Sequence, residues 1–185
     1  DAVSDTGEFA ESGTTGGALI ANDTDPDASD VLAVAAINGN PALVGAGVPG
    51  SAGGVFTIAA DGAYTFDPAG DFEELAVGES RTTTIAYTIS DGHGGTDTAT
   101  IVITVTGTND VPQLIDPATG LPAADPQAIV PSQAVTDGAS IAPLALQPFF
   151  ADPDTSDHLS LSLDPAALPA GLSFDRATGA ITGTL

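Results

Sequence analysis

Hydrophobic and polar residues alternate along much of the chain with a period of two, the pattern of β-strands that bury one face. The longest run spans residues 98–105, where the apolar positions are Ala99, Ile101, Ile103 and Val105. A similar run just before it has the apolar positions Ile85, Tyr87 and Ile89. The segment 90–95 between them, Ser-Asp-Gly-His-Gly-Gly, is rich in turn residues. The two runs therefore predict an antiparallel hairpin.

A second hairpin precedes this one. Phe56 and Ile58 lead into Asp61-Gly62, a preferred pair for a tight turn, and Tyr64 and Phe66 lead out of it. We expect further short strands at 17–21 and 31–37 and an edge strand near the amino terminus. About seven strands in roughly 105 residues predict an Ig-like antiparallel β-sandwich. Long helix-favouring side chains are scarce, so the expected fold class is all-β.

The composition changes after residue 110. A Pro-rich stretch follows, and residues 111–126 are interpreted as a linker or an irregular first strand. Strand-like runs resume at 140–150 and 158–163, and a last hairpin is expected from 172–174 and 180–184. We therefore expect a first domain at 1–110 and a second, incomplete Ig-like β unit at 127–185. A half-sandwich of about four strands would leave one apolar face uncovered and one edge open.

The charge is strongly negative. The chain has 2 Lys+Arg against 25 Asp+Glu, for a formal net charge of -23, yet 42% of its residues are hydrophobic. Enough apolar material is present for a core, so the charge belongs to the surface of a folded protein. This negative surface would repel nucleic acid and anionic membranes, so we expect neither nucleic-acid binding nor membrane insertion, and cations are the favoured partners. An acidic coat that serves solubility alone is the simpler alternative.

The chain has no cysteine, so disulfides cannot stabilise it. A metal that binds only the folded state is one substitute. No basic and apolar leader and no apolar run of about 20 residues is visible, and we expect an internal fragment of a longer protein.

Catalysis is not expected. Only His93 and His158 could act as bases near neutral pH, and both lie in turn segments rich in Asp or Gly. The carboxylates also lie in polar turns, whereas a glycosidase needs one of its carboxyl groups in an apolar cleft.

The carboxylates do suggest metal binding. Asp23, Asp25 and Asp27, with Asp30 nearby, lie in one loop after a predicted strand. In an Ig-like sandwich this loop shares its end with the connector that carries Asp91, and with the segment containing Asp1 and Asp5. Calcium takes six to eight oxygens from flexible loops, so we expect a Ca²⁺ site here. The alternative is that Asp and Asn are present only because they form good turns.

Four stretches resemble the VCBS repeat, a bacterial cadherin-like module. They are Leu-Ile-Ala-Asn-Asp-Thr-Asp-Pro-Asp at 19–27, Ala-Asp-Gly-Ala-Tyr-Thr-Phe at 60–66, Ala-Tyr-Thr-Ile-Ser-Asp-Gly-His-Gly-Gly at 86–95 and Val-Thr-Gly-Thr-Asn-Asp-Val-Pro at 105–112. Their order and spacing cover residues 1–112.

The later residues resemble dystroglycan-type cadherin-like, or Ig-like, modules. The matching stretches are Phe-Ala-Asp-Pro-Asp at 150–154, Leu-Pro-Ala-Gly-Leu-Ser-Phe-Asp at 168–175 and Thr-Gly-Ala-Ile-Thr-Gly-Thr at 178–184. Such modules normally continue into two more strands with another Asp-Gly turn, which this chain does not contain.

Both resemblances imply extended, calcium-dependent arrays on bacterial surfaces or in secreted proteins, often exported by type I secretion. They also imply a junction bridged by calcium, for which the candidates are Asn109, Asp110, Asp152, Asp154 and Asp157. Glu11, Glu73, Glu74 and Glu79 could reach the same end of the first domain, but we expect them to be solvated surface groups.

The expected function is therefore that of a calcium-stabilised extender in a bacterial adhesin that serves cell adhesion or biofilm formation, with neighbouring repeats as partners. A module that binds carbohydrate or another copy of itself, or one attached to a secreted polysaccharide-degrading enzyme, is the alternative.

Overall fold

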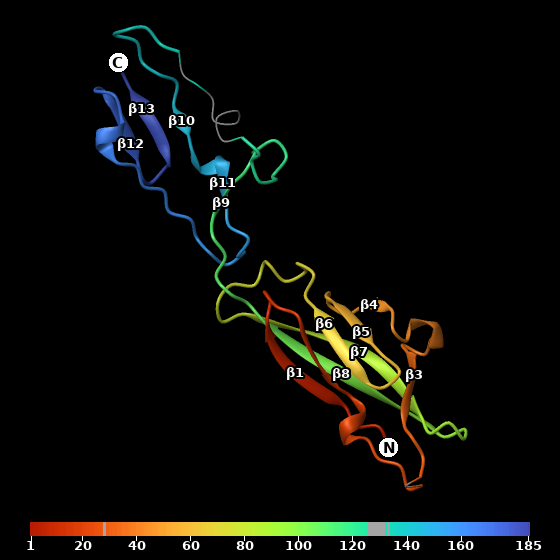
Figure 1. The fold of residues 1–185 in the computed structure, drawn as a ribbon. Helices are drawn as coiled ribbons and strands as arrows, with labels where there is room; N and C mark the ends of the chain where they lie inside the picture. Colours follow the sequence, from red (N-terminus) through yellow and green to blue (C-terminus); the bar gives the residue numbers. More distant parts are fainter. Residues whose placement is uncertain (28, 126–131, 133) are drawn as a thin grey trace. The chain divides into compact units, whose positions relative to one another are not determined.

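The structure is a computed structural model that describes residues 1–27, 29–125, 132 and 134–185 (Figure 1). Contacts divide the chain into two compact units, Asp1–Asn109 (unit 1) and Asp110–Leu185 (unit 2). The start expected for the second domain, residue 127, lies outside the described residues. Each unit is described separately below.

Unit 1 is built from two four-stranded sheets. The first has the order β1-β8-β7-β3, formed by β1 (Asp5–Ala10), β8 (Thr96–Thr106), β7 (Ser80–Ser90) and β3 (Ala33–Ile37). Strand β1 runs parallel to β8, and the other pairs are antiparallel. The second sheet has the order β2-β6-β5-β4 and is formed by β2 (Thr15–Ala18), β6 (Ala63–Asp67), β5 (Val55–Ile58) and β4 (Gly47–Pro49).

The alternation of the long strands places the apolar set inside the sandwich. Ile101, Ile103 and Val105 of β8 are each 0% exposed, and Ile85, Tyr87 and Ile89 of β7 pack in the same cluster. The opposite sheet contributes Phe56 and Phe66, whose ring centroids lie 4.8 Å apart. Both predicted hairpins are confirmed. Gly62, in the turn before β6, has a φ of 85°, which favours glycine.

Two segments of unit 1 differ from the sequence prediction. The strand expected at 17–21 ends at Ala18, and the 3-10 turn η1 (Ile20–Asn22) follows, because the Asp23 N–H bonds back to the Ile20 carbonyl. Strand β4 was not predicted, since it consists only of Gly-Val-Pro and is too short to show alternation. A second 3-10 turn, η2 (Pro41–Leu43), follows β3.

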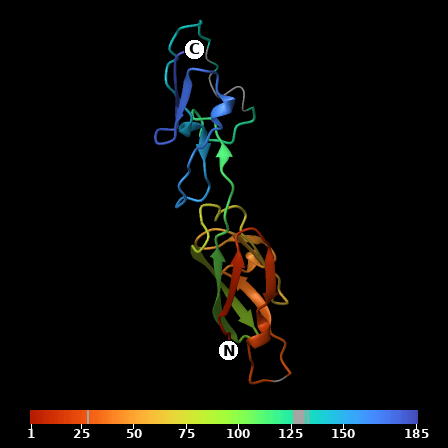
Figure 2. The same cartoon turned by 90° about the vertical axis from the view of Figure 1, so that its left-hand side faces the viewer.

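Unit 2 consists of shorter strands (Figure 2). A three-stranded antiparallel sheet has the order β10-β13-β12, formed by β10 (Leu144–Ala145), β13 (Ala180–Gly183) and β12 (Leu172–Asp175). Strands β9 (Gln113–Leu114) and β11 (Phe150–Ala151) form a separate pair. The 3-10 turns η3 (Gln147–Phe149) and η4 (Pro165–Ala167) complete the elements. Unit 2 is therefore an open and loop-rich β unit.

The strand expected at 158–163 is not formed. Leu159, Leu161 and Leu163 do alternate with more exposed serines, so the pattern exists. A strand also needs a hydrogen-bonded neighbour, however, and none pairs with this segment among the described residues.

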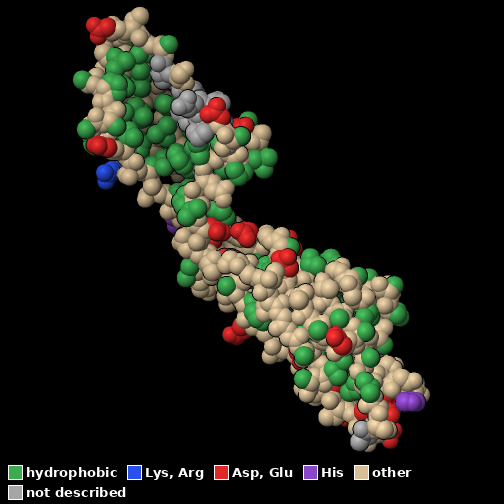
Figure 3. Space-filling model, in the orientation of Figure 1, with side chains coloured by type: hydrophobic (Ala, Val, Ile, Leu, Met, Phe, Trp, Pro, Cys, Tyr) green, Lys and Arg blue, Asp and Glu red, His purple; other side chains and the backbone are tan. Residues whose placement is uncertain are grey.

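The core of unit 2 is thin. Among its described hydrophobic residues only Ile141 and Phe149 are buried, whereas unit 1 buries a large cluster. Figure 3 shows hydrophobic side chains gathered on the visible face of unit 2. Much of this unit is therefore held by turns and polar contacts. No helix in the described part of the chain is long and apolar enough to cross a membrane.

Candidate metal centres

One turn motif recurs in the Asp-rich loops. The Oδ1 atom of an aspartate accepts a hydrogen bond from the N–H two residues later, and the residue between them is proline. This turn occurs at five described positions, namely Asp25, Asp67, Asp116, Asp152 and Asp164. Proline suits the central position because its φ is fixed and it has no N–H. Turn formation therefore explains the first aspartate of each loop.

Turn formation does not explain the residue that follows the proline. At Asp67, Asp116 and Asp164 that residue is alanine, whereas at Asp25 and Asp152 it is a second aspartate. Among the described residues, these two exceptions are also the places where three carboxylates gather. In each group one oxygen per residue lies within 4.8 Å of the others: Asp25, Asp27 and Asp30 in unit 1, and Asp152, Asp154 and Asp157 in unit 2. We call them the unit 1 and unit 2 acidic loops.

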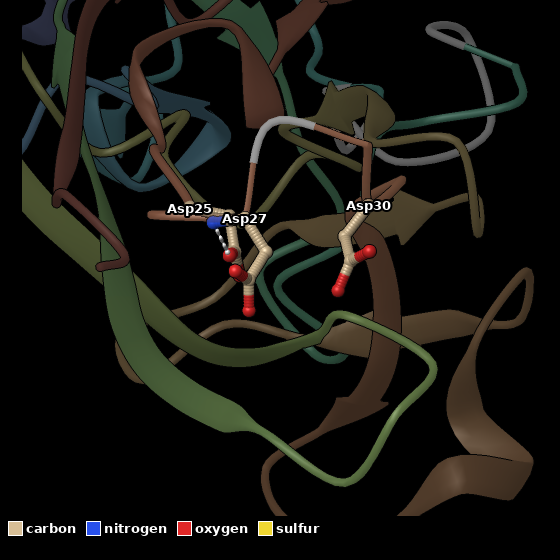
Figure 4. A group of neighbouring side chains, drawn as sticks. All are labelled: Asp25, Asp27 and Asp30. Carbon is tan, nitrogen blue, oxygen red and sulfur yellow. Dashed lines mark hydrogen bonds between the residues drawn. The ribbon is translucent and has the colours of Figure 1, made fainter.

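The unit 1 acidic loop is open to solvent. Figure 4 shows Asp25 and Asp27 side by side, with Asp30 on the other arm of the loop. Asp27 is exposed, and Asp25 and Asp30 are half-buried. The Asp30 carboxylate lies 3.1 Å from Nδ1 of His93, which reaches it from the β7–β8 connector. Protonated His93 can therefore supply positive charge to this loop.

Asp23 and Asp5 lie apart from the unit 1 acidic loop and fix the first residues of the chain. Asp23 Oδ1 accepts the Val3 N–H at 2.7 Å. Asp5 accepts hydrogen bonds from the Tyr87 hydroxyl at 2.8 Å and from the Asn22 amide at 3.1 Å. Burial raises the pKa of Asp5 above its ordinary value, and burial followed by the Asp5 hydrogen bond raises the pKa of Tyr87.

Asp91 closes its own connector. Its Oδ1 accepts the backbone N–H groups of His93 at 2.7 Å and Gly95 at 3.0 Å. These donors, the His93 N–H first, hold the pKa of Asp91 below its usual range. Asp91, Asp25 and Asp97 also line one cavity of about 380 Å³. The structure thus places Asp91 near the unit 1 acidic loop, as a wall of the same cavity.

The unit 2 acidic loop begins directly after β11. The Asp154 N–H donates to Asp152 Oδ1 at 3.1 Å, and the Asp157 N–H donates to the Asp154 carbonyl at 3.1 Å. The Asp110 N–H donates to Asp154 Oδ2 at 2.9 Å, across a sequence separation of 44 residues. Asp110 therefore contacts this loop through its backbone. Asn109 belongs to unit 1.

Asp154 is the most unusual carboxylate of the group. It is 1% exposed, and its Oδ1 is buried without a hydrogen bond from any described residue. A buried carboxylate oxygen without a partner is costly, and neighbouring carboxylates increase that cost. A cation bound at Oδ1 would remove both penalties. The residues therefore fit calcium, with backbone carbonyls and water completing its six to eight oxygens.

Glu11 was expected to be a solvated surface group, and this expectation was wrong. Its side chain is 5% exposed, and Oε1 accepts hydrogen bonds from both the N–H and the hydroxyl of Thr108, the latter at 2.7 Å. Its Oε2 is buried without a partner among the described residues. A signal did exist in the sequence, since Glu11 continues the inward period of Gly7 and Phe9.

The two histidines do not form a catalytic arrangement. Both are exposed, and His93 contacts the Asp30 carboxylate and the Asp91 backbone. The acidic groups that the structure brings together are of a kind that could hold a metal ion.

This fold, a two-sheet and mostly antiparallel sandwich followed by a second β unit with acidic loops, is that of a modular cadherin-like protein. A family model described as "Bacterial cadherin-like domain" matches residues 1–107, and the chain belongs to this family. A second family model, described as "Putative Ig domain", matches residues 122–185. Both resemblances predicted from the sequence are thereby confirmed. Domains of these kinds are typically structural or adhesive and extracellular.

Solved cadherin structures also align with the chain. The chain aligns with Drosophila N-cadherin EC1-4 at 18% identity and a TM-score of 0.47, over 99% of this chain and 40% of that one. The extracellular domain of Protocadherin GammaB4 aligns at 17% identity and a TM-score of 0.39, over 98% and 28%. The chain thus spans less than half the length of these structures. No curated protein sequence matches it.

Proposed function

We propose that this chain is a non-catalytic, calcium-stabilised extender segment of a secreted bacterial adhesin, which serves cell adhesion or biofilm formation. The observation that carries the proposal is Asp154, a carboxylate that is 1% exposed and has one buried oxygen without a partner among the described residues. A side chain in this state suits a cation site better than a simple turn. The family of unit 1 supports the structural and extracellular part of the proposal.

In unit 2 the proposed ligands of Ca²⁺ are the carboxylates of Asp152, Asp154 and Asp157. Asp152 and Asp157 bring negative charge from the surface of the loop, and Asp154 supplies the buried oxygen. The Asp110 N–H fixes the second oxygen of Asp154, so Oδ1 is held in position before an ion arrives. That Asn109 and the Asp110 side chain are also ligands of this ion is a prediction that no observation tests.

In unit 1 we propose two places for calcium. Glu11 offers a buried oxygen near the end of β8, where Thr108 holds its other oxygen. Asp25, Asp27 and Asp30 offer a more exposed site, and Asp91 lines the same cavity as Asp25. The prediction that Asp23 also serves this site is untested, since its Oδ1 accepts the Val3 N–H. Because the exposed group already contacts His93, we expect the weaker binding there.

The partners and location follow from the same proposal. An array of cadherin-like repeats has neighbouring repeats of its own chain as partners, and its export by type I secretion would place it at the bacterial cell surface. Calcium binding after export would then stabilise the folded array by mass action.

Direct carbohydrate binding gains little support from the described residues. Sugar sites usually present exposed aromatic rings, but Phe66 and Tyr87 are 0% exposed and Tyr64 is half-buried. The large exposed hydrophobic residues are Val3, Val31, Val77, Val111 and Leu121, with no aromatic residue among them in the described ranges. Self-association stays a prediction, since β10 and β12 are open edges of the unit 2 sheet.

Thermal unfolding of the whole chain in calcium, in magnesium and in chelator tests this proposal. A calcium-specific rise in melting temperature of about 10 °C or more is expected, because tight binding to the folded state alone adds several kcal/mol. An equal rise with magnesium would mean charge screening of an acidic surface, and no rise would remove the calcium part of the proposal.

A further inference from the structure

The turn after β3 holds an Asn-Gly pair in an unusual conformation. Asn38 and Gly39 both have positive φ, 48° and 76°. Ile37 and Asn40 exchange two backbone hydrogen bonds, of 3.2 and 2.9 Å, which close a two-residue turn of the primed type. Asn38 and Gly39 are exposed at its tip. The Asn-Gly pair explains the turn, but it also carries a reactivity that the calcium function does not use.

The reactive atoms are the side-chain amide of Asn38 and the backbone nitrogen of Gly39. Attack of this nitrogen on Cγ of Asn38 closes a five-membered ring. Gly39 has no side chain to shield it, and even an added Cβ would meet nothing within 4 Å. Among the residues that the structure describes, none accepts a hydrogen bond from the Gly39 N–H. The nucleophile is therefore accessible.

The side-chain carbonyl of Asn38, whose carbon is the electrophile, is polarised by a backbone N–H of β7. Asn38 Oδ1 accepts a hydrogen bond from the Ala86 N–H at 3.2 Å, and this oxygen is the one that gains negative charge when the ring closes. A donor already aimed at a developing oxyanion lowers the barrier to its formation.

The other three asparagines lack this combination. Asn40 precedes Pro41, which has no N–H. The nitrogen that would attack Asn22 belongs to Asp23 and donates to the Ile20 carbonyl at 3.3 Å. The nitrogen that would attack Asn109 belongs to Asp110 and donates to Asp154 at 2.9 Å.

The Asp-Gly pairs, which can form the same ring with loss of water, are also protected. The Gly62 N–H donates to the Ala59 carbonyl at 3.0 Å, and the Gly92 N–H donates to the Ser90 hydroxyl at 3.2 Å. The Gly138 N–H donates to the Leu185 carbonyl. In each pair a hydrogen bond must break before attack.

We propose that Asn38 is a specific site of spontaneous deamidation. The Gly39 nitrogen loses its proton to water or hydroxide and bonds to Cγ of Asn38, and the Cγ–Nδ2 bond breaks as ammonia leaves. Water then opens the cyclic imide at one of its two carbonyls and gives aspartate or isoaspartate. The product adds one negative charge at the turn, and isoaspartate lengthens the backbone where the Asn38 N–H donates to the Ala86 carbonyl at 2.9 Å.

Incubation of the whole chain in warm, mildly alkaline buffer, followed by peptide mass spectrometry and an isoaspartate assay, tests this site. Residue 38 should convert about 3- to 10-fold faster, or more, than any competing asparagine or Asp-Gly pair, because each competitor must first break a hydrogen bond or has no N–H. In denaturant these hydrogen bonds are lost, so the advantage over Asn22, Asn109 and the Asp-Gly pairs should shrink.

The Asn38→Gln variant is the matched control, since its longer side chain closes a five-membered ring far less readily at the same position. It should release no ammonia from the turn while the slow reactions elsewhere continue. First conversion at another position, or an advantage for Asn38 that is no larger in the folded chain than in denaturant, would overturn the proposal.

Discussion

The two acidic loops share a sequence motif and a turn, but they differ in the residues that surround them. Asp25 and Asp152 each begin an Asp-Pro-Asp stretch and form the same hydrogen-bonded turn. In unit 1 the aspartate after the proline, Asp27, is exposed. In unit 2 the equivalent residue, Asp154, is 1% exposed and is fixed through one oxygen by the Asp110 N–H.

The difference in burial comes from the segments of the same chain that pack against each loop. Strand β9 pairs with β11 immediately before the unit 2 loop and leaves Asp110 beside Asp154. The unit 1 loop instead meets the side chain of His93 on an open connector. The sequence of a loop can therefore select carboxylates, but the segments that pack against the loop decide whether an oxygen is held ready for an ion.

The largest expected effect is on calcium affinity in unit 2. Asp154→Asn keeps an acceptor for the Asp110 N–H but removes the buried charge, so calcium should bind at least ~100-fold more weakly, a loss of roughly 3 kcal/mol. Isothermal titration of the whole chain measures this. Asp164→Asn is the control, since it changes the same kind of Asp-Pro turn without a second carboxylate, and it should leave the affinity unchanged. An equal loss of calcium affinity in Asp154→Asn and Asp164→Asn would contradict the claim that the second, buried carboxylate makes the unit 2 site.

The next effect concerns the other buried carboxylate. Glu11→Gln should stabilise unit 1 in chelator by roughly 1–3 kcal/mol, because it removes a buried charge while an oxygen can still accept from Thr108. In calcium the same variant should lose part of the calcium-dependent stability. Urea unfolding in both conditions is the measurement. Glu8→Gln, an exposed position of β1, should have no such effect; a loss of stability in chelator for Glu11→Gln would mean that the charge itself is needed for folding.

A smaller effect is expected in the unit 1 acidic loop. Asp27→Asn should weaken calcium binding by about 10-fold or less, because Asp27 is exposed and the other two carboxylates of the loop, Asp25 and Asp30, are only half-buried. Calcium titration of the whole chain measures this effect. Asp67→Asn is the control, since it alters an equivalent Asp-Pro turn that lacks the second carboxylate, and it should bind calcium like the unchanged chain. If Asp27→Asn lost as much affinity as Asp154→Asn, burial would not be what distinguishes the two loops.

The smallest effect is on the pH dependence of stability. The Ala177 N–H, with the Thr178 side chain, holds the pKa of Asp175 below its ordinary 3.8, and the His93 N–H does the same for Asp91. Each carboxylate therefore contributes stability above pH 3.8 that is lost as the pH falls through its folded-state pKa. Asp175→Asn and Asp91→Asn should each flatten the acid limb of a denaturant-unfolding series. An unchanged acid limb in both variants would contradict these assignments.

The alternation of apolar residues was enough to predict the hairpin of β7 and β8 and the all-β fold, because each long strand buries one complete face. The segment 158–163 has the same alternation, yet it forms no strand, since alternation reports burial and not the presence of a partner. Strand β4 was missed because three residues are too few to show a period.

The candidate site was predictable in part. Asp25 and Asp27 were proposed from their place in one loop, and Asp152, Asp154 and Asp157 from the family resemblance. The structure brings the members of each set together. The hydrogen bond that fixes Asp154 could not be predicted, since its donor is a backbone N–H 44 residues away in the sequence. Glu11 was expected to be solvated because an isolated glutamate usually is, although it continues the inward-facing period of β1 and is 5% exposed.

The central claim is that Asp154 holds a buried oxygen that only a cation satisfies. Urea unfolding of the Asp154→Asn variant and the unchanged chain, both in chelator, tests it most directly. The account predicts that the variant is the more stable protein without calcium, by roughly 1–3 kcal/mol, because the asparagine amide can donate to the neighbouring carboxylates. A variant that is less stable than the unchanged chain in chelator would show that the Asp154 charge is already satisfied by the protein, and would contradict the claim.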